Sequence, residues 1–138
     1  MNTTPTTTHE RTPVATAAAL YDAFAAQDLE RFTGLLAPDA VIHVPGAHPL
    51  AGDHVGRDAV IGFVIDTSVR ADRTESIEVL DLLGGDTHAA AYCHVTGVRD
   101  GRVDLDNTTV HVLRVADGLV REIWFHNWDQ ARVDEFWS

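Results

Sequence analysis

The end of the chain carries the side chains best suited to chemistry. In an extended strand, alternate residues point to the same side. Residues 119–128 therefore place Glu122, Trp124, His126 and Trp128 on one face. Imidazole acts as an acid or a base near neutral pH, and a glutamate in an apolar pocket has its pKa raised toward the same range. The pattern predicts acid–base chemistry beside an aromatic wall.

Two Asp-Gly pairs, 100–101 and 117–118, predict two-residue hairpin turns, because both residue types tolerate positive φ. Residue 92 then lies opposite 109, and residue 111 opposite 124. Opposite residues project to the same side of a sheet. One face is expected to collect Tyr92, His94, Asn107, Thr109, His111, Glu122, Trp124, His126 and Trp128. A bulged second turn would shift the last strand by one residue and exchange its faces, which leaves two registers open.

The polar and aromatic face predicts a pocket, since exposed indoles are unfavourable on a solvated outer face. The opposite, more aliphatic face is expected to pack against a second copy of the chain. The histidines and Glu122 could instead hold a metal ion, but no HxH or HExxH spacing supports this. We therefore expect no metal and no cofactor.

Three further histidines, His43, His48 and His54, lie in or beside the Gly/Pro-rich segment 45–56. They could contact a substrate from a flexible lid, or belong to a solvated loop. The spacing does not decide between the two.

The composition limits the possible partners. A chain of 138 residues suits one domain, and a net charge of -11 argues against nucleic acid or an anionic membrane. One cysteine, Cys93, excludes an internal disulfide and fits a cytoplasmic location. We expect neither a secretory signal nor a transmembrane segment. Residues 1–12 predict a flexible tail, followed by a single domain at 13–138.

The predicted elements are helices followed by an antiparallel meander, which indicates the α+β class. Thr12 and Pro13 predict the start of the first helix, and Asp28 that of a second. The remaining predictions are a strand at 40–44, a helix at 57–71, strands at 76–83, 87–99, 102–115 and 119–128, and a terminal turn or short helix at 129–138.

Three segments resemble a known family. They are "ALYDAFAAQDLERFTGLLAPDAVIHVPG", "LAGDHVGRDAVIGFV" and "VHVLRVADGLVREIWF". They resemble the SnoaL-like, ketosteroid-isomerase-like branch of the nuclear transport factor 2-like (NTF2-like) superfamily, over roughly residues 13–137. The resemblance implies a cone of N-terminal helices packed on a curved antiparallel sheet, a deep pocket and usually a homodimer. It also implies varied chemistry, from isomerases, cyclases (including polyketide cyclases), dehydratases and epoxide hydrolases to plain binding modules.

The family's catalytic sets match this chain only in part. The strand aspartate of the ketosteroid isomerases matches Val44, and their helix tyrosine matches about Leu20, beside Tyr21. Their oxyanion-side aspartate matches His111, which independently indicates that His111 lies in the pocket. The aspartate of the polyketide cyclases matches a position near Phe125. Neither mechanism transfers as a whole.

Our leading hypothesis is a cofactor-independent cyclase, isomerase or dehydratase of secondary metabolism or catabolism. Its substrate would be a hydrophobic or polycyclic small molecule. His111, His126 and Glu122 are the predicted catalytic residues. The predicted substrate-binding residues are Tyr92, His94, Asn107, Thr109, Trp124, Trp128, Tyr21 and Val44. The alternatives are a non-catalytic binding protein, an epoxide-opening enzyme, or a purely structural dimerisation module.

Overall fold

The structure, a computed structural model, describes residues 11–138, so most of the predicted tail lies outside the described residues. The helices are α2 (Pro13–Ala25), α3 (Leu29–Gly34), α4 (Arg57–Arg70) and α5 (Gln130–Trp137). The strands are β1 (Leu36–Val44), β2 (Gly52–Val55), β3 (Ser76–Gly84), β4 (His88–Gly97), β5 (Leu105–Ala116) and β6 (Leu119–Asn127). None of the described helices has the length and apolar character needed to cross a membrane.

Local side-chain caps explain where the helices begin. The Thr12 hydroxyl accepts the Ala15 N–H at 3.1 Å, directly before Pro13 in the first turn of α2. Asp28 caps α3 in the same way, and Asp129 caps α5 by accepting the Arg132 N–H. These caps confirm the predicted starts of α2 and α3. They also resolve the C-terminus as a short helix.

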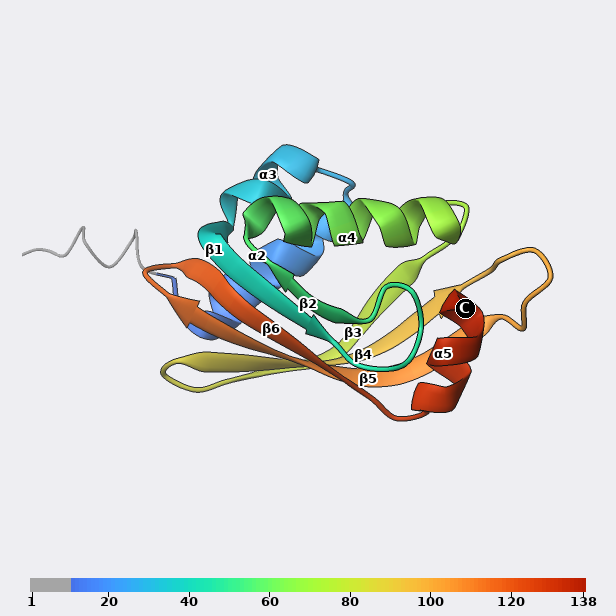
Figure 1. Cartoon of the computed structure of the whole chain (residues 1–138). Helices are drawn as coiled ribbons and strands as arrows, with labels where there is room; N and C mark the ends of the chain where they lie inside the picture. Colours follow the sequence, from blue (N-terminus) through green and yellow to red (C-terminus); the bar gives the residue numbers. More distant parts are fainter. Residues whose placement is uncertain (1–10) are drawn as a thin grey trace, which may run out of the picture.

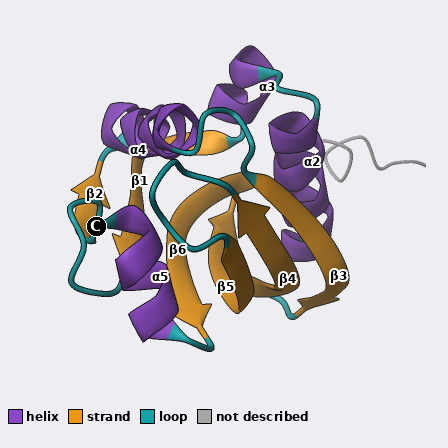
Figure 2. Cartoon of the chain, turned by 90° about the vertical axis from the view of Figure 1, so that its right-hand side faces the viewer, coloured by secondary structure: helices purple, strands orange, loops and turns teal. Residues whose placement is uncertain are grey.

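The six strands form one curved sheet in the order β2-β1-β6-β5-β4-β3. All neighbouring strands are antiparallel except β1 and β6, which are parallel. Helices α2 and α4 pack on one face of the sheet, and α5 lies beside the ends of β5 and β6 (Figures 1 and 2). This arrangement confirms the predicted α+β fold. Strand β2 was missed, because its four residues lie in the segment predicted as a loop.

The last hairpin starts in the predicted register and then leaves it. Ala116 lies opposite Leu119, as the Asp-Gly turn predicts, but the pairing shifts by one residue after Val115. His111 therefore lies opposite Phe125 and not opposite Trp124. A β-bulge leaves one residue unpaired, here Arg121, and turns every later side chain to the other face.

The preceding hairpin is also shifted by one residue. Strand β4 ends at Gly97 and β5 begins at Leu105, so the loop is longer than the two predicted residues. His111 lies opposite Ala91, and Thr109 lies opposite Cys93. The predicted shared face of β4, β5 and β6 is therefore wrong. The concave face instead combines His111 and Thr109 with Ala91, Cys93 and Phe125, which the predicted register puts on the more aliphatic face.

Candidate active site

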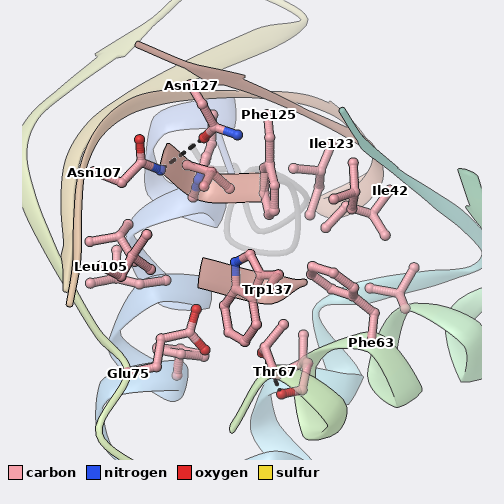
Figure 3. A pocket seen from close by; sticks show the side chains of 18 of the residues that line it. Ile42, Phe63, Thr67, Glu75, Leu105, Asn107, Ile123, Phe125, Asn127 and Trp137 are labelled. Atoms are coloured by element: carbon pink, nitrogen blue, oxygen red, sulfur yellow. Dashed lines mark hydrogen bonds between the residues drawn. The ribbon is translucent and has the colours of Figure 1, made fainter. Parts of the chain in front are cut away.

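A cavity lies between the concave face of the sheet and helices α2, α4 and α5 (Figure 3). Its volume is about 890 Å³, open mouth included. The apolar part of its wall consists of Leu20, Phe24, Phe32, Ile42, Val44, Val60, Phe63, Val64, Ile77, Val95, Leu105, Ile123, Phe125, Val133 and Trp137. The polar side chains in the wall are Tyr21, His48, Thr67, Glu75, Asn107, His111 and Asn127. Such a wall suits an apolar small molecule that carries a few polar groups.

A tyrosine and a histidine form a hydrogen-bonded pair in this wall. Tyr21 projects from α2 and His111 from β5, and their Oη and Nδ1 atoms are 2.7 Å apart. Together the neutral side chains hold two protons, and one of them is used between the two rings. Either tautomer of the imidazole therefore leaves one donor free, the Nε2–H of His111 or the O–H of Tyr21. The pair can donate a hydrogen bond to an oxygen of a bound molecule.

Burial keeps both members of the pair uncharged. The apolar surroundings lower the pKa of His111 to about 3, and the nearby His126 adds to the effect. The Phe125 ring stacks on the imidazole, with 4.1 Å between the ring centroids. Burial also raises the pKa of Tyr21 well above its usual value, with a further contribution from Cys93. At neutral pH the pair is therefore a neutral donor, and His111 does not act as a cation.

Glu75 brings a carboxyl group to the same cavity. It lies in the turn before β3, and Figure 3 shows its carboxylate turned toward the cavity beside Trp137. Oxygen Oε1 is enclosed and has no hydrogen-bond partner among the described residues. Burial raises the pKa of Glu75 to about 7, and the nearby Thr67 hydroxyl acts in the opposite direction. A carboxyl group with this pKa can both take up and release a proton near neutral pH.

A chain of amide side chains closes the end of the cavity next to α5. The Asn107 amide donates to Asn127 Oδ1 at 2.9 Å, and the Asn127 amide donates to Gln130 Oε1 at 2.9 Å. Gln130 in turn donates to Asp134 Oδ1 at 2.9 Å. These bonds fix how each amide is oriented, because every nitrogen in the chain already has an acceptor.

Four of the predicted site residues line the cavity: Tyr21, Val44, Asn107 and His111. Thr109 is buried on the same face, where its hydroxyl donates to the His126 carbonyl at 3.2 Å, but it does not line the cavity. Tyr21 and His111 come from segments 90 residues apart in the sequence. The resemblance placed both near the pocket, and the structure brings them into contact.

The other predicted site residues lie on the convex face. They are Tyr92, His94, Glu122, Trp124, His126 and Trp128, and none of them lines the cavity. The shifts in both hairpins move them away from His111. Trp128 is 88% exposed, so its indole is not the expected pocket wall. The structure thus separates His126 and Glu122 from His111, the third predicted catalytic residue.

The sequence gives no indication of Glu75 as a candidate, and for His48 it leaves open a substrate-contacting lid or a solvated loop. Glu75 lies in the polar stretch "RADRTES", which resembles any solvated turn, and no local pattern indicates that its carboxylate is enclosed. His48 is 7% exposed because the loop after β1 folds back against α5. Gly46 permits this approach: its φ is +113°, and a Cβ atom there would collide with Gln130 and Asp134. In the sequence, the feature connected with the burial of His48 is the glycine two residues before it.

Among residues 11–138 there is no cluster of three or more His, Cys, Asp or Glu side chains that could hold a metal ion. Cys93 is buried, and burial raises the pKa of its thiol to about 11, so the thiol does not act as a nucleophile at neutral pH. The chemistry available in the cavity is that of Tyr21, His111, Glu75, Asn107 and His48.

Comparison with known proteins agrees with the fold. The model of the SnoaL-like domain family matches residues 17–123. The chain belongs to this family. The uncharacterized protein Rv0034 of Mycobacterium tuberculosis is 34% identical over 119 residues, which is 86% of this chain and 90% of Rv0034.

Solved structures share the whole fold. Bal32a, from a soil-derived mobile gene cassette, superimposes with a TM-score of 0.86 at 29% identity, covering 90% of this chain and 95% of Bal32a. Rv0760c from M. tuberculosis, solved in complex with estradiol-17beta-hemisuccinate, has a TM-score of 0.73 at 21% identity, covering 88% of this chain and 98% of Rv0760c. NTF2-like proteins of Burkholderia and a putative ketosteroid isomerase of Kribbella flavida share the fold at 18% to 21% identity. At such identities the likeness shows the fold alone.

Proposed function

We propose that this SnoaL-like protein is a small-molecule enzyme that moves protons on an apolar substrate bound in the cavity. The observation that carries the proposal is the Tyr21–His111 pair, neutral and hydrogen-bonded at 2.7 Å in an apolar wall that also contains Glu75. The reaction class is that of an isomerase, cyclase or dehydratase. These groups can supply the chemistry without a cofactor.

The roles follow from the charges. The free donor of the Tyr21–His111 pair hydrogen-bonds the carbonyl oxygen of the substrate and stabilises the negative charge that develops there. Ionised Glu75 takes a proton from the carbon next to the carbonyl, so the C–H electron pair moves into the enolate. Glu75 then returns the proton to the same or another carbon. A buried neutral donor and a carboxyl group with a pKa near 7 suit this division of labour.

The proposed substrate is polycyclic or otherwise extended and mostly apolar. The many aromatic and aliphatic side chains of the wall support this, and so does the steroid derivative bound to Rv0760c on the same fold. Val44 favours a second candidate, a binding protein without catalysis. The cavity face of β1 is apolar there, where the ketosteroid isomerases carry an aspartate.

Hydrogen–deuterium exchange tests the proposal without a known substrate. In D2O, the protein should accelerate exchange next to the carbonyl of a bicyclic ketone such as 2-tetralone, measured by NMR. Tyr21→Phe combined with His111→Phe should lower the rate by about 10²-fold or more, and Glu75→Gln by a similar factor. His88→Ala, which changes an exposed histidine, is the matched control. Binding of the ketone with no exchange above buffer would favour the binding protein.

We also propose a homodimer. Its interface would be the polar and aromatic convex face of the sheet, and not the more aliphatic face expected from the sequence. Exposed Tyr92 and Trp128 lie on this convex face together with half-buried Trp124. Light scattering should give twice the chain mass for the wild type, and Trp128→Asp should shift it toward the monomer. A cytoplasmic location is likewise expected and stays a prediction.

A further inference from the structure

His48 presents an unpaired hydrogen-bond donor to the cavity. Its Nδ1 accepts the Leu50 N–H at 3.2 Å, so the proton of the neutral ring lies on Nε2. Burial lowers the pKa of His48 and outweighs the smaller effects of Asp134 and the Pro45 carbonyl, which keeps the ring neutral near pH 7. Nε2 is enclosed and has no hydrogen-bond partner among the described residues.

Asn107 presents an unpaired acceptor. Its amide nitrogen donates to Asn127, so the orientation of the amide is fixed and Oδ1 points away from that bond (Figure 3). Oδ1 is enclosed and has no partner among the residues that the structure describes. Asn107 is 7% exposed, and a buried polar atom without a partner is unusual enough in proteins to need an explanation.

Both side chains belong to the same end of the cavity. Asn107 connects to Gln130 through Asn127, and the loop residue Gly46 lies close to both His48 and the same Gln130. Residues His48 and Asn107 both line the cavity. The wall of the cavity near α5 thus holds one donor and one acceptor that lack a hydrogen-bond partner among the described residues.

We propose that His48 and Asn107 form a subsite for a hydroxyl group, and hence that the ligand is an alcohol or a phenol at this end. The subsite rests on the proposed function, because it assigns the second polar group of the same ligand. A hydroxyl oxygen accepts from His48 Nε2–H while its proton is donated to Asn107 Oδ1. A ketone or an ether satisfies only His48. A carboxylate would place negative charge against Asn107 Oδ1.

Three probes separate these requirements: 2-naphthol, 2-methoxynaphthalene and naphthalene. The first donates and accepts, the second only accepts, and the third does neither. Titration calorimetry on the wild type should give a Kd for 2-naphthol about tenfold below that for 2-methoxynaphthalene, with naphthalene weaker still. Equal Kd values for the first two would overturn the subsite.

Two variants should then separate the contribution of Asn107 to the binding of 2-naphthol from that of His48. Asn107→Leu should weaken only 2-naphthol, by about tenfold, while His48→Phe should weaken 2-naphthol and 2-methoxynaphthalene alike. Thr108→Val, next to Asn107 on the exposed side of the same strand, is the control and should change neither. A hydroxyl preference that survives in Asn107→Leu and disappears in Glu75→Gln would assign the hydroxyl to Glu75 and overturn the proposal.

If either variant fails to fold, a crystal structure of the wild type with 6-bromo-2-naphthol decides. The bromine fixes the orientation of the ring. The hydroxyl oxygen should lie within about 3.2 Å of both His48 Nε2 and Asn107 Oδ1. A hydroxyl bound elsewhere overturns the subsite. The exchange assay does not depend on this result, so the proposed function and the subsite can fail separately, whereas no binding by any probe would count against both.

Discussion

On the convex face of the sheet His43 lies between two carboxylates, whereas on the concave face His111 is hydrogen-bonded to the neutral Tyr21. His43 Nδ1 is 2.7 Å from Asp53, and its Nε2 contacts Glu122, which also pairs with Arg114. The hydrogen bond that His43 donates to Glu122 is the largest cause of the raised pKa of His43. Burial is the largest cause of the lowered pKa of His111.

The comparison shows that residue type alone does not locate the chemistry. Both faces contain histidine, carboxylate and aromatic side chains. On the convex face their charges are paired and reach solvent, as in the bond of 2.6 Å between His94 and Asp106. On the concave face Glu75, His48 and Asn107 each have an enclosed polar atom without a hydrogen-bond partner among the described residues. A polar group without a partner is costly in an apolar cavity, so a bound molecule that supplies the partner gains the most binding free energy there.

The largest expected effect tests which face of β6 is buried. Ile123→Asp places a carboxylate in the core, since Ile123 is 5% exposed, and should destabilise the fold by about 4 kcal/mol or more. His126→Asp changes an exposed position on the other face and should stay within about 0.5 kcal/mol. Urea unfolding measures both. A larger loss of stability in His126→Asp than in Ile123→Asp would mean that β6 pairs without the bulge, as the Asp-Gly turn alone predicts.

The next effect tests whether Glu75 is as enclosed as its geometry indicates. Its pKa is about 7 in the folded chain against 4.5 in the reference state, so the folded protein binds the extra proton between these values. Stability should therefore fall as pH rises from 4.5 to 7 and then level off. Glu75→Gln should remove this loss, with a relative gain of up to about 3 kcal/mol at pH 8. Parallel pH profiles of the two proteins would show that Glu75 is solvated.

The smallest effect concerns the charges of the convex face. Glu122→Gln removes the partner of His43 and Arg114, yet we expect a loss below about 1 kcal/mol, because the pairs are reached by solvent. The loss should shrink further in high salt. NMR titration should show the pKa of His43 falling in the variant. A loss comparable with that of Ile123→Asp would mean that the two faces do not differ as proposed.

Local signals in the sequence determined most of the elements. Thr12, Asp28 and the Asp-Gly pair at 117–118 act through hydrogen bonds and turn preferences within a few residues, and the structure places a helix or turn at each of them. The family resemblance added the curved sheet and the position of His111. These features depend on short-range chemistry or on a pattern shared by many chains.

The faces of the strands and the contents of the cavity were decided only by tertiary structure. One unpaired residue at Arg121 turned the rest of β6 over, and a longer loop did the same for β4 relative to β5. No local pattern indicates a shift of one residue. A strand repeats every two residues, and either set of alternating side chains in "REIWFHNW" could plausibly face a pocket. Glu75 and His48 became site residues for a related reason. Their burial is set by α5 and Trp137, which lie far along the sequence and meet them only when the cone closes.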